Sequence, residues 1–250
     1  MDLAVQRAET RKSPQERERI DDLFRLVPVG GGLALDAGAW DGHLARRLAE
    51  RYERVVALDL TAPTIDHERV TCVQGDITAL NYPDDSFDLV LCTEVLEHVP
   101  TERLATACAE LARVTRRHLV IGVPFEQDLR LGQTTCRSCG RRNPPWGHVN
   151  SFTMDRLRGL FAGLRIEATS LVGQRTGTNA LAAKVFDLAG NPWGTYGQEQ
   201  GCVHCGAKLV APERGLTTKA LMALGSALYF PGVWLRGYQP GWVHLHLVKE

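Results

Sequence analysis

The sequence lacks any excess of charge of one sign. Its 29 Lys and Arg side chains balance 29 Asp and Glu, so the formal net charge at pH 7 is zero. A broad nucleic-acid-binding face needs an excess of basic side chains, so we expect no nucleic-acid partner, although a local basic patch stays compatible with this balance.

Long apolar runs are lacking as well. The longest uncharged apolar stretch, Ala220–Leu235, contains Gly225, Pro231 and Gly232. It is too short and too interrupted for a good transmembrane helix, so we expect no transmembrane span. This stretch is either a buried helix or a surface that faces lipid or a partner.

Two phosphate-binding signatures are absent. No strand is followed by G-x-G-x-x-G, which excludes the usual dinucleotide fingerprint, and no G-K-[ST] is present, which excludes a P-loop. Residues 1–19 are polar and charged, so we expect no secretory signal and a cytoplasmic location. Disulfides are rare in that compartment, and the seven cysteines are therefore expected to be thiols or metal ligands.

Apolar runs and helical patterns alternate along most of the chain. This alternation predicts an α/β fold with a seven-stranded, mostly parallel, Rossmann-like sheet covered by helices on both faces. Strands are expected at Leu33–Asp36, Val55–Leu60, Val70–Val73, Phe87–Cys92, His118–Val123, Leu164–Val172 and Val243–Val248. Helices are expected at 15–27, after Gly42, and at 101–115, 153–163, 179–189 and 217–229.

The first strand runs into a turn with the pattern D-x-G-x-W-x-G, from Asp36 through Gly38 and Trp40 to Gly42. Glycines at such a turn let the backbone approach a ligand closely. Asp59 closes the second strand, where a carboxylate is able to accept both ribose hydroxyls of a nucleotide-like cofactor.

The segments "LALDAGAWDGHL", "RVVALDLTAP" and "QGDITALNYPDDSFDLVLCTEVLEHVP" follow one another. As a set, this succession resembles class I S-adenosylmethionine-dependent methyltransferases, most closely the small-molecule and quinone-biosynthesis type. The resemblance covers 31–124 and extends to 148–172, which contains "GHVNSFTMDRLRGLF".

The resemblance implies a role for several positions. Asp36 and Gly38 would hold the amino-acid end of the methyl donor, and Asp59 with Leu60 would hold the ribose. Asp76 and Ile77 would contact adenine. Glu94 would lie near the methyl group, on the loop after the fourth strand.

Trp40 departs from the family pattern, because it stands where the family has a middle glycine, between the retained Gly38 and Gly42. Two orientations stay open. Its indole packs over the methionine part of the donor, where a sulfonium would make a cation–π contact, or it points away and packs on the N-terminal helix.

Methylation of a hydroxyl requires a general base, and His suits that task near neutral pH. His148 is the first candidate and His98 the second, since each lies beside a segment expected to end at the ligand-binding rim. Two other interpretations stay open. Glu97 and His98 cap the helix near Thr101, or the acceptor is an amine or an activated carbon that needs no strong base.

Four of the cysteines form two C-x-x-C-G motifs, "CRSCG" with Cys136 and Cys139, and "CVHCG" with Cys202 and Cys205. Two such turns supply the tetrahedral sulfur ligands that Zn²⁺ prefers, and a site with four cysteines is structural. Iron and redox-active thiols are the alternatives.

These features divide the chain into six segments: an N-terminal helical segment (1–30), the donor-binding core (31–124), an insertion with the first cysteine pair (125–150), a core continuation (151–172), a second insertion with the other pair (173–241) and a last core strand (242–250). We expect a methyltransferase acting on a small-molecule acceptor such as a sugar, natural product or quinone-like compound. An RNA methyltransferase that uses Arg141 and Arg142, and a non-catalytic binding module, are the alternatives. Neither the acceptor nor the oligomeric state follows from the sequence.

Overall fold

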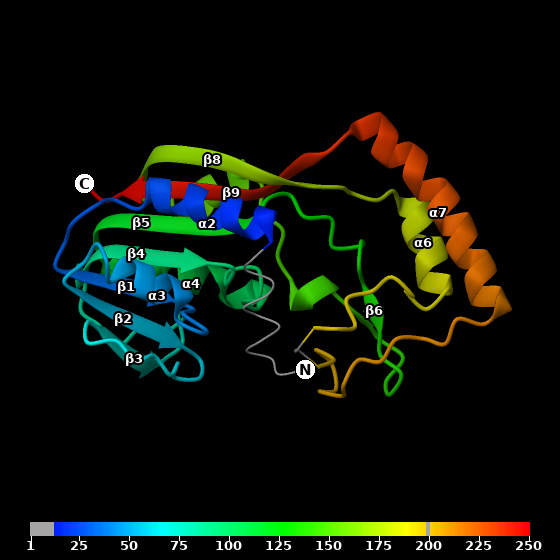
Figure 1. The fold of residues 1–250 in the computed structure, drawn as a ribbon, viewed down its shortest axis with the longest axis horizontal. Coiled ribbons are helices and arrows are strands. Elements are labelled where there is room, and N and C mark those ends of the chain that lie inside the picture. Colours follow the sequence, from blue (N-terminus) through cyan, green and yellow to red (C-terminus); the bar gives the residue numbers. More distant parts are fainter. Residues whose placement is uncertain (1–12, 199–200) are drawn as a thin grey trace. The chain divides into compact units, whose positions relative to one another are not determined.

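The computed structural model describes residues 13–198 and 201–250, and the chain divides into two compact units (Figure 1). Unit 1 comprises Met1–Phe125, Phe152–Gly173 and Pro240–Glu250. Unit 2 comprises Glu126–Ser151 and Gln174–Gln239. Its two segments follow the strands that end near Pro124 and Arg175.

Unit 1 is built on a seven-stranded sheet in the order β3-β2-β1-β4-β5-β9-β8. The first five of these strands pair in parallel, and β9 pairs antiparallel with β5. The strands are β1 Leu33–Ala37, β2 Arg54–Asp59, β3 Val70–Gln74, β4 Phe87–Thr93, β5 Thr115–Pro124, β8 Arg165–Arg175 and β9 Gln239–Val248. The predicted fold class is confirmed.

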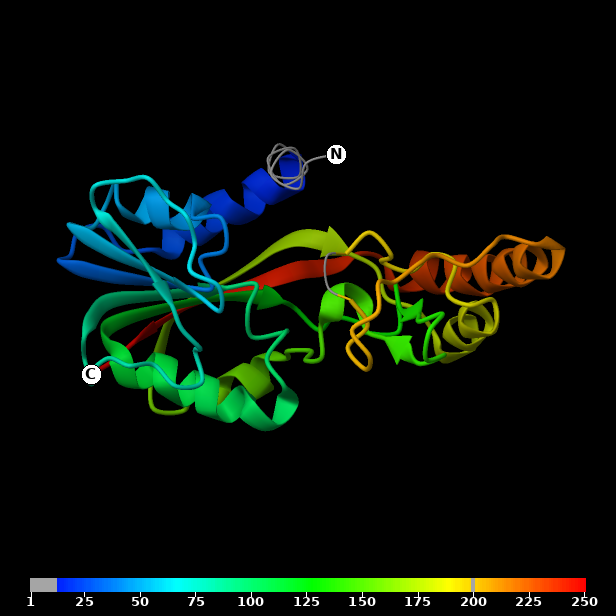
Figure 2. The same ribbon diagram turned by 90° about the horizontal axis from the view of Figure 1, so that it is seen from below.

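Helices cover both faces of this sheet, as Figure 2 shows for the blue helices on one side and the green helices on the other. The first side carries α2 (Pro14–Leu26) and α3 (His43–Leu48), and the second carries α4 (Leu104–Val114) and α5 (Met154–Leu160). A short 3-10 helix, Thr101–Arg103, precedes α4. Each face has its own buried apolar cluster, so unit 1 is stabilised by apolar burial on both sides.

The local sequence explains where α2 begins and which face it buries. The Ser13 side chain accepts a hydrogen bond from the Glu16 backbone N–H, which caps the helix, and Pro14 occupies its first turn. Ile20, Leu23 and Phe24 recur at helical spacing and are buried.

The strand order reverses direction between β1 and β4. From β1 the chain first builds outward through β2 and β3, and then returns to add β4 on the other side. Ligands of open α/β sheets bind at such a point, beyond the carboxyl ends of the strands.

Unit 2 contains a small hairpin and two helices. The hairpin pairs β6 (Thr134–Thr135) with β7 (Arg142–Asn143), and the 3-10 turn Pro145–Gly147 follows it. Helix α6 (Ala180–Leu188) packs on α7 (Leu216–Arg236), which continues past the predicted end and across Pro231. Among the described residues, none of the helices combines the length and apolarity needed to cross a membrane.

Candidate active site and cysteine cluster

The turn after β1 forms a tight backbone cradle. The N–H groups of Gly38 and Ala39 both donate to the Leu58 carbonyl, at 2.8 and 3.0 Å. Gly38 has φ +87°, and a Cβ there would lie 2.1 Å from Cγ2 of Val95. Gly42 has φ +74°, and a Cβ there would lie 2.2 Å from Cδ1 of Ile65. Both positions therefore require glycine.

Asp36 is the last residue but one of β1, and its carboxyl is buried. Burial raises the pKa of Asp36 to about 7, against the lowering effect of the Ala45 backbone N–H and together with the nearby negative charge of Asp59. Its Oδ2 has no hydrogen-bond partner among the described residues. A buried acceptor without a donor is costly, so this oxygen fits a cationic or hydrogen-bonding ligand.

Trp40 and Asp59 lie together at the carboxyl ends of β1 and β2. The Trp40 backbone, at φ 47°, donates its N–H to Oδ2 of Asp59 at 2.8 Å, and the Leu60 N–H donates to Oδ1 at 2.7 Å. These contacts fix the carboxylate and leave each oxygen a further lone pair. Both residues line a cavity of about 380 Å³ whose remaining lining is Thr61, Ala62, Pro63 and Thr64.

The loop after β3 holds Asp76 in a local turn. Oδ1 of Asp76 accepts from the N–H and hydroxyl of Thr78, at 2.8 and 2.7 Å, and Oδ2 lies 3.3 Å from Arg103. The Thr78 backbone N–H and Arg103 hold the pKa of Asp76 below its usual value. Ile77 beside it is buried.

Glu94 follows β4 at the reversal point of the sheet. It is a non-glycine residue with φ 55°, and its N–H donates to the Gly122 carbonyl at 3.0 Å. Since Ala37 and Cys92 are neighbours in the β1–β4 register, Glu94 directly follows the strand next to the one that carries Asp36. Its Oε1 is 3.7 Å from Nη1 of Arg19, which comes from α2.

Comparison with known proteins agrees with this geometry. A family described as a methyltransferase domain matches residues 35–120. The chain is 40% identical over 113 residues to a malonyl-[acyl-carrier protein] O-methyltransferase of Halorhodospira halophila, covering 40% of this chain and 38% of that protein. It is 30% identical over 107 residues to a ubiquinone biosynthesis O-methyltransferase of Albidiferax ferrireducens, covering 38% of this chain and 42% of that protein. The chain thus spans less than half the length of either relative.

Residues 35–120 thus carry a methyltransferase domain. The fold extends the likeness beyond the matched residues. A putative methyltransferase from Bacillus halodurans superposes with a TM-score of 0.59 at 15% identity, covering 92% of this chain and 98% of that one. A chain of the complex between the Haloferax volcanii Trm112 methyltransferase activator and a putative methyltransferase superposes with a TM-score of 0.55 at 14% identity, over 98% and 94% of the two chains.

Sequence reasoning missed a group of buried polar residues in the methyltransferase domain. Glu97 is fully buried, and neither of its carboxylate oxygens has a hydrogen-bond partner among the described residues. Burial and the neighbouring Glu94 raise the pKa of Glu97 well above its usual value. Arg19 is also buried, with Nη2 donating to Glu16 at 2.6 Å. Arg19 was missed because the surrounding "PQERERIDD" reads as a solvated helix face.

A second buried pair joins α2 to β9. Nδ1 of His244 lies 2.7 Å from Oδ2 of Asp22, and the Ser170 hydroxyl donates to Oδ1 of Asp22 at 2.8 Å. Burial lowers the pKa of His244, against the raising effect of Asp22. This pair fastens α2 to the sheet, and the only sequence signal for it was the alternation of His244 and His246 along the last strand.

The two candidate bases belong to different units of the chain. His98 is exposed on the turn after β4 in the methyltransferase domain. Pro100 is the N-cap of the next helix, Thr101–Arg103, and neither carboxylate oxygen of Glu97 has a hydrogen-bond partner among the described residues, so Glu97 does not cap that helix. His148 is buried in unit 2, and its Nδ1 lies 2.6 Å from Oε1 of Gln127. An amide oxygen only accepts, so Nδ1 carries the proton and the basic lone pair is on Nε2.

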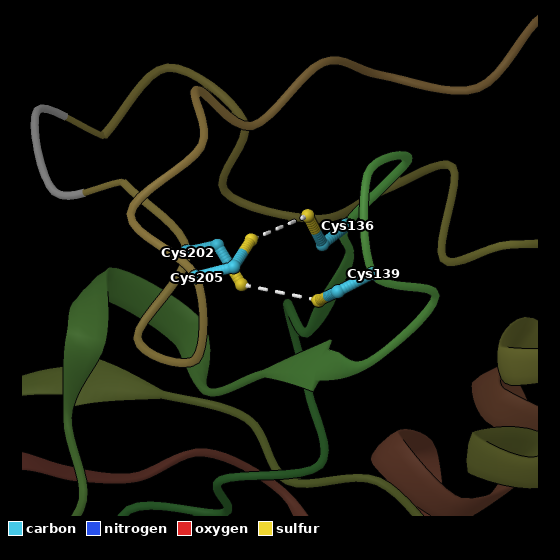
Figure 3. A group of neighbouring side chains, drawn as sticks. All are labelled: Cys136, Cys139, Cys202 and Cys205. Atoms are coloured by element: carbon cyan, nitrogen blue, oxygen red, sulfur yellow. Dashed lines mark hydrogen bonds between the residues drawn. The ribbon is translucent and has the colours of Figure 1, made fainter.

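The four paired cysteines meet in unit 2, where their sulfur atoms all lie within 4.8 Å of one another (Figure 3). The Sγ atoms of Cys136 and Cys205 are 3.7 Å apart, as are those of Cys139 and Cys202. A tetrahedron of sulfurs about 2.3 Å from a central Zn²⁺ has edges of roughly 3.8 Å, so the observed spacing fits that metal.

The two cysteine turns have matching backbone geometry. The glycine after each pair, Gly140 and Gly206, has positive φ and donates its N–H to the carbonyl of the first cysteine, at 2.9 and 2.8 Å. Although burial acts in the opposite direction, the backbone N–H groups of His204 and Cys205 and the neighbouring thiols lower the pKa of Cys202, and the same thiols raise the pKa of Cys205. A thiol that is readily deprotonated is a better metal ligand.

Proposed function

We propose that this chain transfers a methyl group from S-adenosylmethionine to a small-molecule acceptor, by O- or N-methylation of a quinone-like compound, a sugar or a natural product. When bound, the donor supplies a methyl group on a positively charged sulfur. The observation that carries the proposal is the Asp59 carboxylate, which is held in place beside Trp40. It lies at the carboxyl ends of the parallel strands, where the glycine turn, the buried Asp36 and the loop with Glu94 also lie.

Each group of the donor has a matching set of residues under this proposal. Asp36, Gly38 and Gly42 hold its amino-acid end, since Asp36 offers a buried oxygen that lacks a donor. Asp59 and Leu60 hold the ribose, and Asp76 with Ile77 borders the adenine. Trp40 is half exposed and lines the same cavity as Asp59, which supports the orientation toward the donor.

Proton removal from a hydroxyl acceptor falls to His148 in the same proposal. Gln127 fixes the tautomer that a general base needs, with the proton on Nδ1. His98 is the alternative base, and Glu94 lies near the transferred methyl group, where burial raises the pKa of its carboxyl against the lowering effect of Arg19.

The four cysteines are proposed to hold one structural Zn²⁺. The buried apolar cluster around them consists of Cys136, Cys202 and Leu209, with Tyr196 and Ala207 at its edge. So small a core gives little stabilisation, and metal binding would supply folding energy to this part of unit 2. We also propose that unit 2 is the substrate cap that holds the acceptor.

Calorimetric titration of the full chain with S-adenosylmethionine, followed by a methyl-transfer assay against quinone-like, sugar and natural-product acceptors, tests the function. Donor binding that depends on Asp59 supports it. Absence of donor binding by folded protein would reject it.

A further inference from the structure

We propose that the outward face of α7 docks on an anionic lipid surface. This inference concerns a part of the chain that the proposed methyl transfer does not use. It begins from the division of α7 into two faces, of which one packs on α6 and the other does not (Figure 1).

The packed face of α7 is well defined. Gly225 is buried against Phe186 of α6, and a Cβ on it would lie 2.6 Å from the Phe186 ring. Tyr229, one turn later, makes an edge contact with the same ring at a centroid distance of 6.5 Å. The Tyr229 hydroxyl is 2.6 Å from the hydroxyl of Thr176, so this face already has its partners.

The opposite face is exposed and apolar along the whole helix. Positions spaced by three, four and seven residues fall on one side of a helix, and here the outward positions between Thr217 on one flank and Lys219 on the other are exposed and apolar. These residues are Leu216, Ala220, Ala223, Leu224, Ala227, Phe230, Pro231 and Trp234. Leu216 is 87% exposed, Phe230 64% and Trp234 84%. A face meant only for water would carry polar side chains, so this face is a contact surface.

Charge decides which partner the face suits. Lys219 is exposed at the border of the apolar stripe. The segment 214–236 contains no acidic residue. A cation beside an apolar stripe on a segment without acidic residues matches an anionic, partly apolar surface.

The aromatic side chains support the same partner. Phe230 and Trp234 lie near the end of the helix, and Tyr238 follows it, 67% exposed. Trp and Tyr favour the interface between lipid headgroups and acyl chains. Because α7, as far as its residues are described, does not combine the length and apolarity needed to span a bilayer, the geometry points to a helix lying in the interface plane.

The test is flotation of the full chain with vesicles of phosphatidylcholine containing phosphatidylglycerol, beside vesicles of phosphatidylcholine alone. We expect binding to the anionic vesicles that weakens as salt is raised. The double variant Phe230→Ser/Trp234→Ser should bind at least about tenfold more weakly, since it removes two apolar anchors. Lys219→Ala should weaken binding about fivefold, on anionic vesicles only.

Val29→Ser is the matched control, because Val29 is an 82% exposed apolar residue in unit 1. It should float like the unaltered chain, and calorimetry with S-adenosylmethionine should verify that every variant retains its folded unit 1. Failure of the unaltered chain to bind anionic vesicles, or equal binding by the double variant, would overturn the proposal. Self-association of the chain that the double variant abolishes, without vesicle binding, would assign the face to a second copy instead.

Discussion

The two units of this chain obtain their stability in different ways. Unit 1 buries apolar side chains on both faces of a seven-stranded sheet, whereas the cysteine region of unit 2 gathers only a few buried residues around four sulfur atoms. The first can fold by apolar burial alone, whereas under the proposed zinc site the second would depend on metal binding. Because of this difference, a treatment that acts on only one unit should change donor binding or acceptor turnover without changing the other.

Removal of the metal should have the largest effect. Cys139→Ser or strong chelation should loosen 125–150 and 190–215, because metal binding at structural zinc sites is worth about 10–16 kcal/mol in small peptides. Acceptor turnover should be abolished while calorimetry still detects donor binding. Hydrogen exchange and elemental analysis, with about one zinc per chain expected, measure the outcome.

Cys72→Ser supplies the control for that experiment, because Cys72 is a half-buried thiol of unit 1 outside the cluster. It should leave the zinc content unchanged. Metal-free protein with full activity would refute the proposed structural zinc site.

Loss of the proposed base should come next. His148→Ala should lower turnover by about 10²–10⁴-fold with little change in donor affinity, since general-base catalysis contributes about that factor. Gln127→Leu should lower turnover less, because it removes the hydrogen bond that holds the proton on Nδ1 of His148. Steady-state kinetics at saturating donor measure both. Near-normal turnover of His148→Ala, with a large loss in His98→Ala, would transfer the role to His98.

Asp59→Ala should weaken donor binding by about 1.5–3 kcal/mol, roughly 10- to 150-fold, because charge-assisted hydrogen bonds to the ribose would be lost. Calorimetric titration gives the affinity. Asp66→Ala, an exposed acid on the connection between β2 and β3, should bind the donor normally. Unchanged affinity in folded Asp59→Ala would reject the ribose assignment.

The pH dependence of donor binding should be the smallest effect. With the pKa of Asp36 at about 7, binding of a cationic donor requires loss of a proton at lower pH, so affinity should fall about eightfold between pH 7.5 and 6. Asp36→Asn should bind more weakly and without this dependence.

The raised pKa of Asp36 also makes the stability of the donor-free chain depend on pH. A carboxyl whose pKa is raised in the folded state contributes stability fully below its unfolded value of about 3.9, and loses it as the pH rises through about 7. Thermal unfolding should therefore show a decline over that window that Asp36→Asn lacks. An identical decline in the variant would assign it to other groups.

Most of unit 1 could be predicted from the sequence, because buried strands of a parallel sheet appear as short apolar runs, such as Phe87–Cys92 inside β4. The positions of Asp36 and Asp59 at strand ends were predictable for the same reason. The burial of Glu97 and Arg19 was not, since it arises from the packing of α2 over the loop after β4. The β6–β7 hairpin was also missed, because two-residue strands beside a cysteine turn leave no periodic pattern.

The place of β9 in the sheet has a consequence for biosynthesis. This strand lies between β5 and β8, yet the ribosome makes it after both of them. Until β9 emerges, one edge of β5 is unpaired, and β8 lacks the strand with which it pairs in the sheet. A translating ribosome adds about 5–20 residues each second, so the unpaired edge of β5 persists for many seconds. Exposed strand edges recruit other chains, and binding of a chaperone to the nascent chain would protect the protein best during that interval.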